Sequence, residues 1–323
     1  NFLGTTEDDW FCTACIQSFF PFNGISCDDE FICCAKNYDY SFTQDINLPE
    51  ISELRFNPFS VDENRFLANN EDIDPDGNFF NNFALPNSQY RIASEIQPVN
   101  DDNPASTFTL FHANCRSIEA NLTNLMSTIA SLKFNVSVIA VSETWTNSSN
   151  ENLISIPGYN AIFNSRTDRT GGGVGLFIHD SLSFVVRNDL QLLTDKSVVE
   201  CVFVELVHDN VIIGCLYRPP DCNVGLFTSF VDSLLSKINR ERKKCYIAGD
   251  YNIDLLKFDV HQPTADYVNC IFSHAYLPVI NKPTRITDYS ATLIDNILTN
   301  DQLQSSSSSI VLSDISDHFP ILF

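Results

Sequence analysis

The chain has 323 residues, of which 44% are hydrophobic and 26 are phenylalanine, so it is long and apolar enough to bury a large core. Its formal net charge of −22 excludes a strongly basic surface for binding nucleic acid. No apolar stretch reaches the roughly 18 residues of a membrane helix. The N-terminus lacks the basic start and apolar run of a signal peptide. We therefore expect a nuclear or cytoplasmic protein that is neither secreted nor held in a membrane.

The negative charge is concentrated in the first third of the chain. Residues 1–106 carry 4 Lys and Arg against 19 Asp and Glu, a net of −15, whereas residues 107–323 carry 15 against 22, a net of −7. The cysteines number eleven, and most of those after residue 106 stand singly in apolar runs. This spacing favours reduced thiols in a core over a disulfide framework.

Residues 1–36 contain one pair of cysteines at metal-ligand spacing. Trp10 precedes Cys12 by two residues, and Cys15 completes a Cys-x-x-Cys. The stretch resembles the last turn of a plant homeodomain zinc finger, but one pair supplies only two of the four ligands of a structural zinc. We expect a truncated finger whose Cys12 and Cys15 bind nothing as they stand, with zinc bound only if the full finger were present. Two incidental cysteines are the alternative.

Residues 37–106 are rich in Asn, Asp, Pro and Ser, and their apolar residues follow neither a 3.6 nor a 2.0 period. Such a segment cannot bury a continuous face, so we predict an acidic, mostly disordered linker. Docking of its aromatic residues on a partner is the other interpretation.

Residues 107–323 alternate apolar runs of strand and helix character. β-branched runs of four to ten residues predict strands, and apolar residues at helical spacing predict helices. A hairpin is predicted across His208-Asp209-Asn210, and a loop at Ser305–Ser309. The predicted strands are Thr107–His112, Val136–Val141, Tyr159–Phe163, Gly173–His179, Val198–Val207, Val211–Leu216, Cys245–Ala248 and Ser309–Leu312, and the predicted helices are Ile118–Leu132 and Leu226–Ile238.

Polar clusters follow several of these runs in a fixed order, and polar groups at strand ends can converge on one site. The clusters are His112-Ala113-Asn114-Cys115-Arg116-Ser117, Ser142-Glu143-Thr144-Trp145, Tyr217-Arg218-Pro219-Pro220, Gly249-Asp250-Tyr251-Asn252, Leu293-Ile294-Asp295-Asn296 and Ser316-Asp317-His318.

This order resembles the endonuclease/exonuclease/phosphatase superfamily, and in detail the apurinic-type endonuclease domain of non-LTR retrotransposons. The resemblance implies an α+β fold, a four-layer α/β/β/α sandwich over residues 107–323, with the last strand truncated at Phe323. Arg116 stands where repair-type members place a second acid, which argues against a base-excision repair enzyme.

The resemblance also assigns roles. It implies Glu143 and Asp317 as metal ligands for Mg²⁺, with Mn²⁺ possible, and a phosphate contact for Ser316. Arg116 and Arg218 would bind the substrate. Asp250 would activate the attacking water, Asn252 would donate to a phosphoryl oxygen, and an acid in an apolar strand, Asp295, would need His318 as its partner. The implied catalytic set is His318, Asp250, Asn252, Asp295, Tyr217 and Asn114.

We therefore expect a Mg²⁺-dependent DNA endonuclease that leaves a 3′-hydroxyl and derives from a retrotransposon reading frame. A full-length element would carry a reverse transcriptase as partner, and none follows here. Two alternatives stay open: a phosphatase or phosphodiesterase of the same superfamily that acts on a small phosphorylated substrate, and an inactive transposon fragment.

Overall fold

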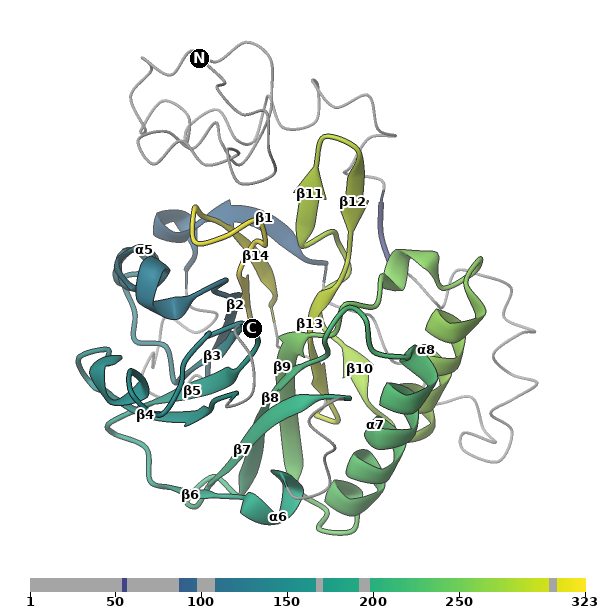
Figure 1. The fold of residues 1–323 in the computed structure, drawn as a ribbon, viewed down its shortest axis with the longest axis horizontal. Coiled ribbons are helices and arrows are strands. Elements are labelled where there is room, and N and C mark those ends of the chain that lie inside the picture. The colour runs from purple at the N-terminus through teal and green to yellow at the C-terminus, as the bar shows by residue number, and fades with distance from the viewer. Residues whose placement is uncertain (1–53, 57–86, 98–107, 167–170, 192–197, 302–306) are drawn as a thin grey trace.

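The computed structural model describes residues 54–56, 87–97, 108–166, 171–191, 198–301 and 307–323. Two β-sheets pack face to face, with helices on both outer sides (Figure 1). The predicted four-layer α/β/β/α sandwich is thus confirmed. Cys12 and Cys15, and with them the zinc-finger prediction, lie outside the described residues. Within these ranges no helix is both long and apolar enough to cross a bilayer.

The first sheet has the strand order β1-β14-β15-β2-β3-β5-β4 among the described residues. Helix α5, Ile118–Ser131, covers its outer face (Figure 1). The strands are β1 (Gln89–Ile92), β2 (Leu110–Asn114), β3 (Val138–Ser142), β4 (Tyr159–Asn164), β5 (Val174–His179), β14 (Ser309–Leu312) and β15 (Ile321–Leu322).

The second sheet has the order β10-β13-β9-β8-β7-β6 over the same part of the chain. Helices α7, Val224–Asn239, and α8, Gln262–Ser273, cover it from outside (Figure 1). A separate hairpin of β11 (Arg285–Thr287) and β12 (Ser290–Thr292) projects beyond the sheets. The remaining elements are β6 (Phe184–Val186), α6 (Asn188–Gln191), β7 (Glu200–Leu206), β8 (Val211–Tyr217), β9 (Lys244–Asp250), β10 (Leu277–Pro278) and β13 (Asp295–Thr299), with short 3-10 turns at Ala93–Glu95, Glu151–Leu153 and Leu255–Lys257.

Strands β2 and β3 show why these apolar runs become buried strands. Leu110 and Val138 face the core between the sheets, while Phe111 and Ile139 face α5. Successive side chains of a strand point to opposite faces, so a run that is apolar throughout fits only a sheet covered on both sides. Sequence patterning is enough to predict this burial.

The carboxyl ends of four strands, two from a parallel pair in each sheet, lie along one edge of the sandwich, which we call the rim. β2 runs parallel to β3, and β8 runs parallel to β9. Helices α5 and α7 make these two crossovers, because parallel strands cannot be joined by a tight turn. Since β2 and β3 also pack against β9, the polar residues that end these strands are brought together.

The linker prediction for residues 37–106 is wrong for residues 87–97. β1 pairs in parallel with β14 and extends the first sheet, and the turn that follows buries Ala93 and Ile96, each 6% exposed, near α5. Phe56 is also buried, with its ring edge-on to Phe258. The sequence does not reveal this strand, because its four residues are too few to show the two-residue alternation of a β-strand.

Candidate functional site

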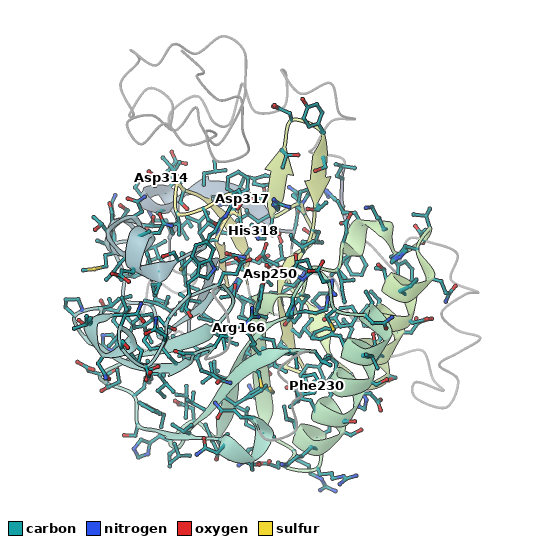
Figure 2. The ribbon with its side chains drawn as sticks, in the orientation of Figure 1. Arg166, Phe230, Asp250, Asp314, Asp317 and His318 are labelled. Atoms are coloured by element: carbon teal, nitrogen blue, oxygen red, sulfur yellow. The ribbon has the colours of Figure 1, made fainter. Side chains whose placement is uncertain are left out.

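Asp250, Asp317 and His318 lie close together in Figure 2, and the other residues predicted to carry chemistry come from the ends of neighbouring strands. Asn114 ends β2, Glu143 follows β3, and Tyr217 ends β8. Asp250 ends β9 directly opposite Asp295, the first residue of β13. His318 comes from the loop between β14 and β15.

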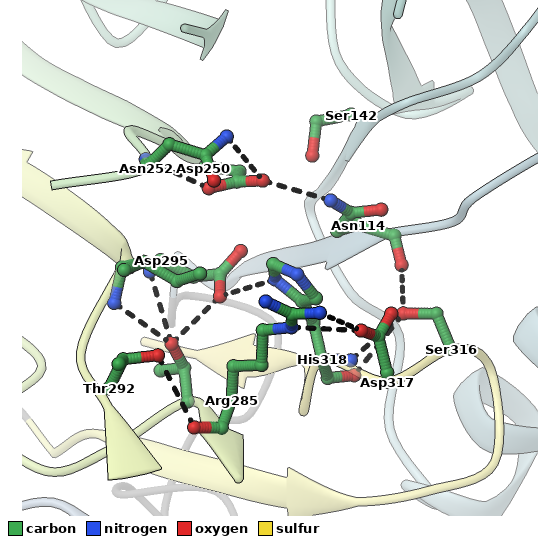
Figure 3. A network of polar contacts seen from close by, with 12 residues as sticks. Asn114, Ser142, Asp250, Asn252, Arg285, Thr292, Asp295, Ser316, Asp317 and His318 are labelled. Atoms are coloured by element: carbon green, nitrogen blue, oxygen red, sulfur yellow. Dashed lines mark hydrogen bonds and ion pairs between the residues drawn. The ribbon is translucent and has the colours of Figure 1, made fainter. Parts of the chain in front are cut away.

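Asn114 joins the two sheets through its side-chain amide. Its Nδ2 donates to Glu143 Oε1 at 2.9 Å and to Asp250 Oδ2 at 2.9 Å, and Figure 3 shows the second of these bonds. The two carboxylate oxygens are therefore no further apart than the sum of those bonds. Like charges this close repel, so the arrangement favours a cation beside them.

Glu143 has a left-handed backbone that the surrounding chain holds in place. Its φ is +50°, which is uncommon for a residue with a side chain. Its carbonyl accepts from Ser117 N at 2.9 Å, and the next two amides donate to glycine carbonyls, Thr144 N to Gly173 at 3.2 Å and Trp145 N to Gly172 at 2.8 Å. Strained residues persist only where neighbours fix them, and they cluster at functional sites.

The three consecutive glycines, residues 171–173, are held in place by an ion pair between Arg166 and Glu200, and Glu200 begins β7 of the second sheet. Glu200 accepts from Arg166 Nε at 2.6 Å, and its other oxygen accepts from the backbone amide of Gly173. A Cβ at Gly172 would lie 2.5 Å from the Arg166 guanidinium, so that position has no room for a side chain. The predicted site includes neither Arg166 nor Glu200. The signals in the sequence are an acid that begins a mostly apolar strand and three consecutive glycines.

Asp250 is fully buried, and its environment makes its carboxyl group a weaker acid than an exposed aspartate. Burial first, then the charges of Asp295 and Glu143, raise its pKa to about 7. A carboxylate with this pKa can take up a proton near neutral pH.

Asn252 lies beside Asp250, just after the end of the strand. β9 ends at Asp250, and a left-handed residue, φ +48° at Asn252, turns the chain back. The Asn252 backbone amide donates to Asp250 Oδ1 at 3.0 Å, while its side-chain Nδ2 donates to Arg218 O at 2.9 Å and to Asp250 Oδ2 at 3.3 Å. Both amide protons are thus used inside the protein, and the predicted donation to a phosphoryl oxygen does not fit this arrangement.

Asp295 and His318 form the predicted pair. His318 Nδ1 lies 2.9 Å from Asp295 Oδ2, which also accepts from the Thr284 hydroxyl at 2.7 Å (Figure 3). Burial alone would lower the pKa of His318, but the charges of Asp295, Asp250 and Asp317 raise it to about 10. These carboxylates therefore favour the protonated form of the imidazole. Asp295 keeps one buried oxygen, Oδ1, without a hydrogen bond among the described residues.

Tyr217 is in register with Asp250 on one side and Glu200 on the other. Burial first, then the charges of Glu143 and Asp250, raise its pKa well above the ordinary value for a phenol. The hydroxyl therefore keeps its proton and can donate it to an oxygen in the site.

Two residues predicted to bind substrate are structural instead. Arg218 is 3% exposed, and its guanidinium donates to the backbone carbonyls of Tyr251, Cys222 and Asn252. The hydroxyl of Ser316 is also buried, and it donates to Asn114 O at 2.6 Å while it accepts from His318 N at 3.1 Å. Arg218 fixes the loop after β9, and Ser316 fixes the His318 loop on the end of β2.

Asp317 contacts two arginines rather than facing an open metal position. Arg285 Nε and Nη2 lie 2.8 and 2.7 Å from its Oδ2, and Arg116 Nη1 lies 3.7 Å from Oδ1. Burial opposes the ionised form of Asp317, yet His318 and the arginines hold its pKa below the ordinary value. The predicted metal role of Asp317 therefore conflicts with its contacts. Arg285, which the sequence analysis missed, places a part-exposed cation at the rim.

The model of the endonuclease/exonuclease/phosphatase family matches residues 111–318. This range contains all the polar clusters that form the site, from Asn114 to His318. This chain belongs to that family. No curated protein matches its sequence.

Solved structures share the fold of this endonuclease/exonuclease/phosphatase domain. The endonuclease domain of TRAS1, a telomere-specific non-LTR retrotransposon, superposes with a TM-score of 0.51 at 12% identity, over 67% of this chain and 97% of that one. The catalytic domain of Xenopus laevis APE2 gives 0.50 at 18% identity, over 67% and 90%. At these identities the likeness concerns the fold alone.

The donor atoms of the site fit a hard divalent cation. Carboxylate oxygens of Glu143 and Asp250 face one amide, and oxygen ligands are those that Mg²⁺ prefers. Asp250, Asp295 and His318 form a second set whose donor atoms lie within 4.8 Å of one another. Because the pKa of His318 is raised to about 10, its ring must lose a proton before it can bind a metal. The Glu143 side of the site is therefore the better match for Mg²⁺.

Proposed function

We propose that this protein is a Mg²⁺-dependent endonuclease that hydrolyses a DNA phosphodiester and leaves a 3′-hydroxyl. The observation that carries the proposal is the convergence of Glu143 and Asp250 on Asn114, next to the buried Asp295 and His318 pair. Carboxylates, a protonated imidazole and a protonated phenol at one rim supply what phosphodiester hydrolysis requires.

The residues divide the work by their charge and protonation. Asp250, with a pKa near 7, would accept a proton from the attacking water, and Asn252 would hold its carboxylate in position. The His318 cation would neutralise charge that develops on the phosphoryl oxygens, with Asp295 fixing its ring. Tyr217 would donate a hydrogen bond to the same group. Asn114 would orient both carboxylates.

Glu143 would hold the Mg²⁺, next to the Asp250 carboxylate that accepts the proton. A bound Mg²⁺ supplies positive charge to the phosphate and to the leaving oxygen. Mn²⁺, which accepts the same ligands, should replace it in the assay.

Arg285 and Arg116 support a polyanionic substrate. Both are part-exposed, 43% and 42% for the side chains, and both flank Asp317 beside His318. A DNA strand continues past the cleaved bond, so its neighbouring phosphates would lie within reach of such flanking cations. A phosphoester with a single phosphate has no second one to place there. We further propose that the domain derives from a retrotransposon reading frame, which Arg116 two residues after Asn114 and the Tyr217-Arg218-Pro219-Pro220 motif support by their resemblance to such endonucleases.

Nicking of supercoiled plasmid tests the proposal. The full chain should nick with Mg²⁺ or Mn²⁺ and not with a chelator, and a DNA polymerase should extend the nicks without prior phosphatase treatment. Glu143→Ala should lose activity about 10²-fold or more. Glu119→Ala, which removes an exposed glutamate of α5 outside the site, should nick like the wild type.

The alternative substrates are tested with the same preparations. Phosphate release from inositol phosphates or nucleotides, with intact plasmid, would assign the domain to small phosphoesters instead. Absence of every activity in a folded protein that still binds Mn²⁺ would favour an inactive fragment. Undiminished nicking by Glu143→Ala would refute the role given to that residue.

A further inference from the structure

A second group of possible metal ligands lies on the outer helices, away from the rim. Asp232 comes from α7, Cys270 from α8, and His274 caps the end of α8. One donor atom from each lies within 4.8 Å of the other two. His274 Nε2 is 2.8 Å from Asp232 Oδ1, while Cys270 Sγ has only a long contact, 3.8 Å, to Thr228 O.

Helical geometry sets up this cluster. Residues four apart lie on the same face of a helix, so Cys270 and His274 both point toward α7. The end of α8 is held there, because Asn239 Nδ2 donates to His274 O at 3.0 Å. Cys270 and His274 are half-buried and Asp232 is exposed, so an ion could reach the cluster from solvent without opening the core.

The three donors differ in kind from those at the rim. A thiolate, an imidazole and a carboxylate suit Zn²⁺, whereas Mg²⁺ takes oxygen ligands. Zinc bonds of about 2.0–2.3 Å require tetrahedral ligands to stand roughly 3.2–3.8 Å apart. The 2.8 Å between His274 Nε2 and Asp232 Oδ1 and the 4.8 Å limit for the whole group lie on either side of this range. Water would take the fourth position on the exposed side.

We propose that Asp232, Cys270 and His274 bind one Zn²⁺ that ties α7 to α8. This site is independent of the proposed nuclease activity. Burial and the charge of Asp232 raise the pKa of the Cys270 thiol to about 12, so zinc must displace its proton. Affinity should therefore fall as the pH is lowered. Because Asp232 and His274 attract each other without a metal, the alternative is an ion pair beside a protonated thiol.

Cobalt substitution and zinc content distinguish the two on the full chain. Co²⁺ bound to a thiolate gives a sulfur-to-metal charge-transfer band that the oxygen ligands of the rim cannot give. The chain contains other cysteines, so the comparison is between variants. Cys270→Ser should bind one equivalent of Zn²⁺ less than the wild type and lose the matching part of the Co²⁺ band. Cys222→Ser, a half-buried cysteine outside the cluster, should change neither.

A second variant guards against a folding defect in Cys270→Ser. Asp232 is exposed, so Asp232→Asn should fold normally, bind Zn²⁺ at least tenfold more weakly and lose the rise in melting temperature that Zn²⁺ gives the wild type. Equal zinc stoichiometry in wild type, Cys270→Ser and Asp232→Asn would overturn the proposal and leave the ion pair alone. So would an unchanged Co²⁺ band.

Discussion

Ile96 tests whether the segment before residue 107 belongs to the folded domain. Ile96 is 6% exposed and packs in the cluster beneath α5, although its surroundings in sequence predict a linker. Ile96→Ala removes three carbon atoms from this cluster. At about 0.8 kcal/mol for each buried methylene, with a further cost for the cavity, unfolding should become easier by about 2.5–4 kcal/mol.

The measurement is urea unfolding followed by circular dichroism, with Leu153→Ala as the matched control. Leu153 is 77% exposed, so its truncation should change the free energy of unfolding by less than about 0.5 kcal/mol. The slope of the free energy against urea should be the same in both variants. If Ile96→Ala is as mild as Leu153→Ala, the docking of residues 87–97 is refuted.

Truncation extends this test to the whole strand. A chain lacking residues 1–86 keeps β1, whereas one lacking residues 1–100 loses it and exposes the edge of β14. Unpaired edges promote aggregation, so the shorter chain should be less soluble and less stable than the longer one. Tyr90 also packs on Phe319, next to His318, and donates to Pro283 O. Loss of β1 should therefore lower nicking as well.

Three further predictions concern the site. In a double-mutant cycle, Asp295→Ala with His318→Ala should nick scarcely less than His318→Ala alone, because the two act as one unit; losses that multiply would show independent roles. The folded-state pKa of His318, about 10, lies above its ordinary 6.5, so the stability it contributes is complete below pH 6.5 and lost as the pH rises toward 10. In chelator, the gap in unfolding free energy between wild type and His318→Gln should shrink over that range, and a constant gap would contradict the charged pair. Glu200→Ala leaves Arg166 buried without its partner, so the free energy of unfolding should fall by about 3–5 kcal/mol. The affinity for Mn²⁺, measured by electron paramagnetic resonance, should also fall, because the glycine run would no longer hold the Glu143 turn. Unchanged Mn²⁺ affinity in a folded Glu200→Ala would limit Glu200 to stability.

The sequence by itself determined the buried strands and the polar residues at their ends, and its resemblance to the family implied the layers of the sandwich. Alternation along a strand is a local property, so runs such as Val138–Ser142 reveal that both faces are covered. The apolar run around Asp295 likewise indicated that this acid needs a partner, and the resemblance named His318 as the partner that the structure shows.

Only the tertiary structure decided which polar groups are free to act. Arg218 and Ser316 look like phosphate ligands in sequence, but backbone groups brought close by the packing of the sheets occupy their donors. Ser316 and its acceptor on Asn114 are 202 residues apart, and no local pattern encodes such a contact. The same holds for Glu200 with Arg166. Hydrogen-bond partners across a core depend on how the sheets pack, whereas burial of each strand depends on its own residues.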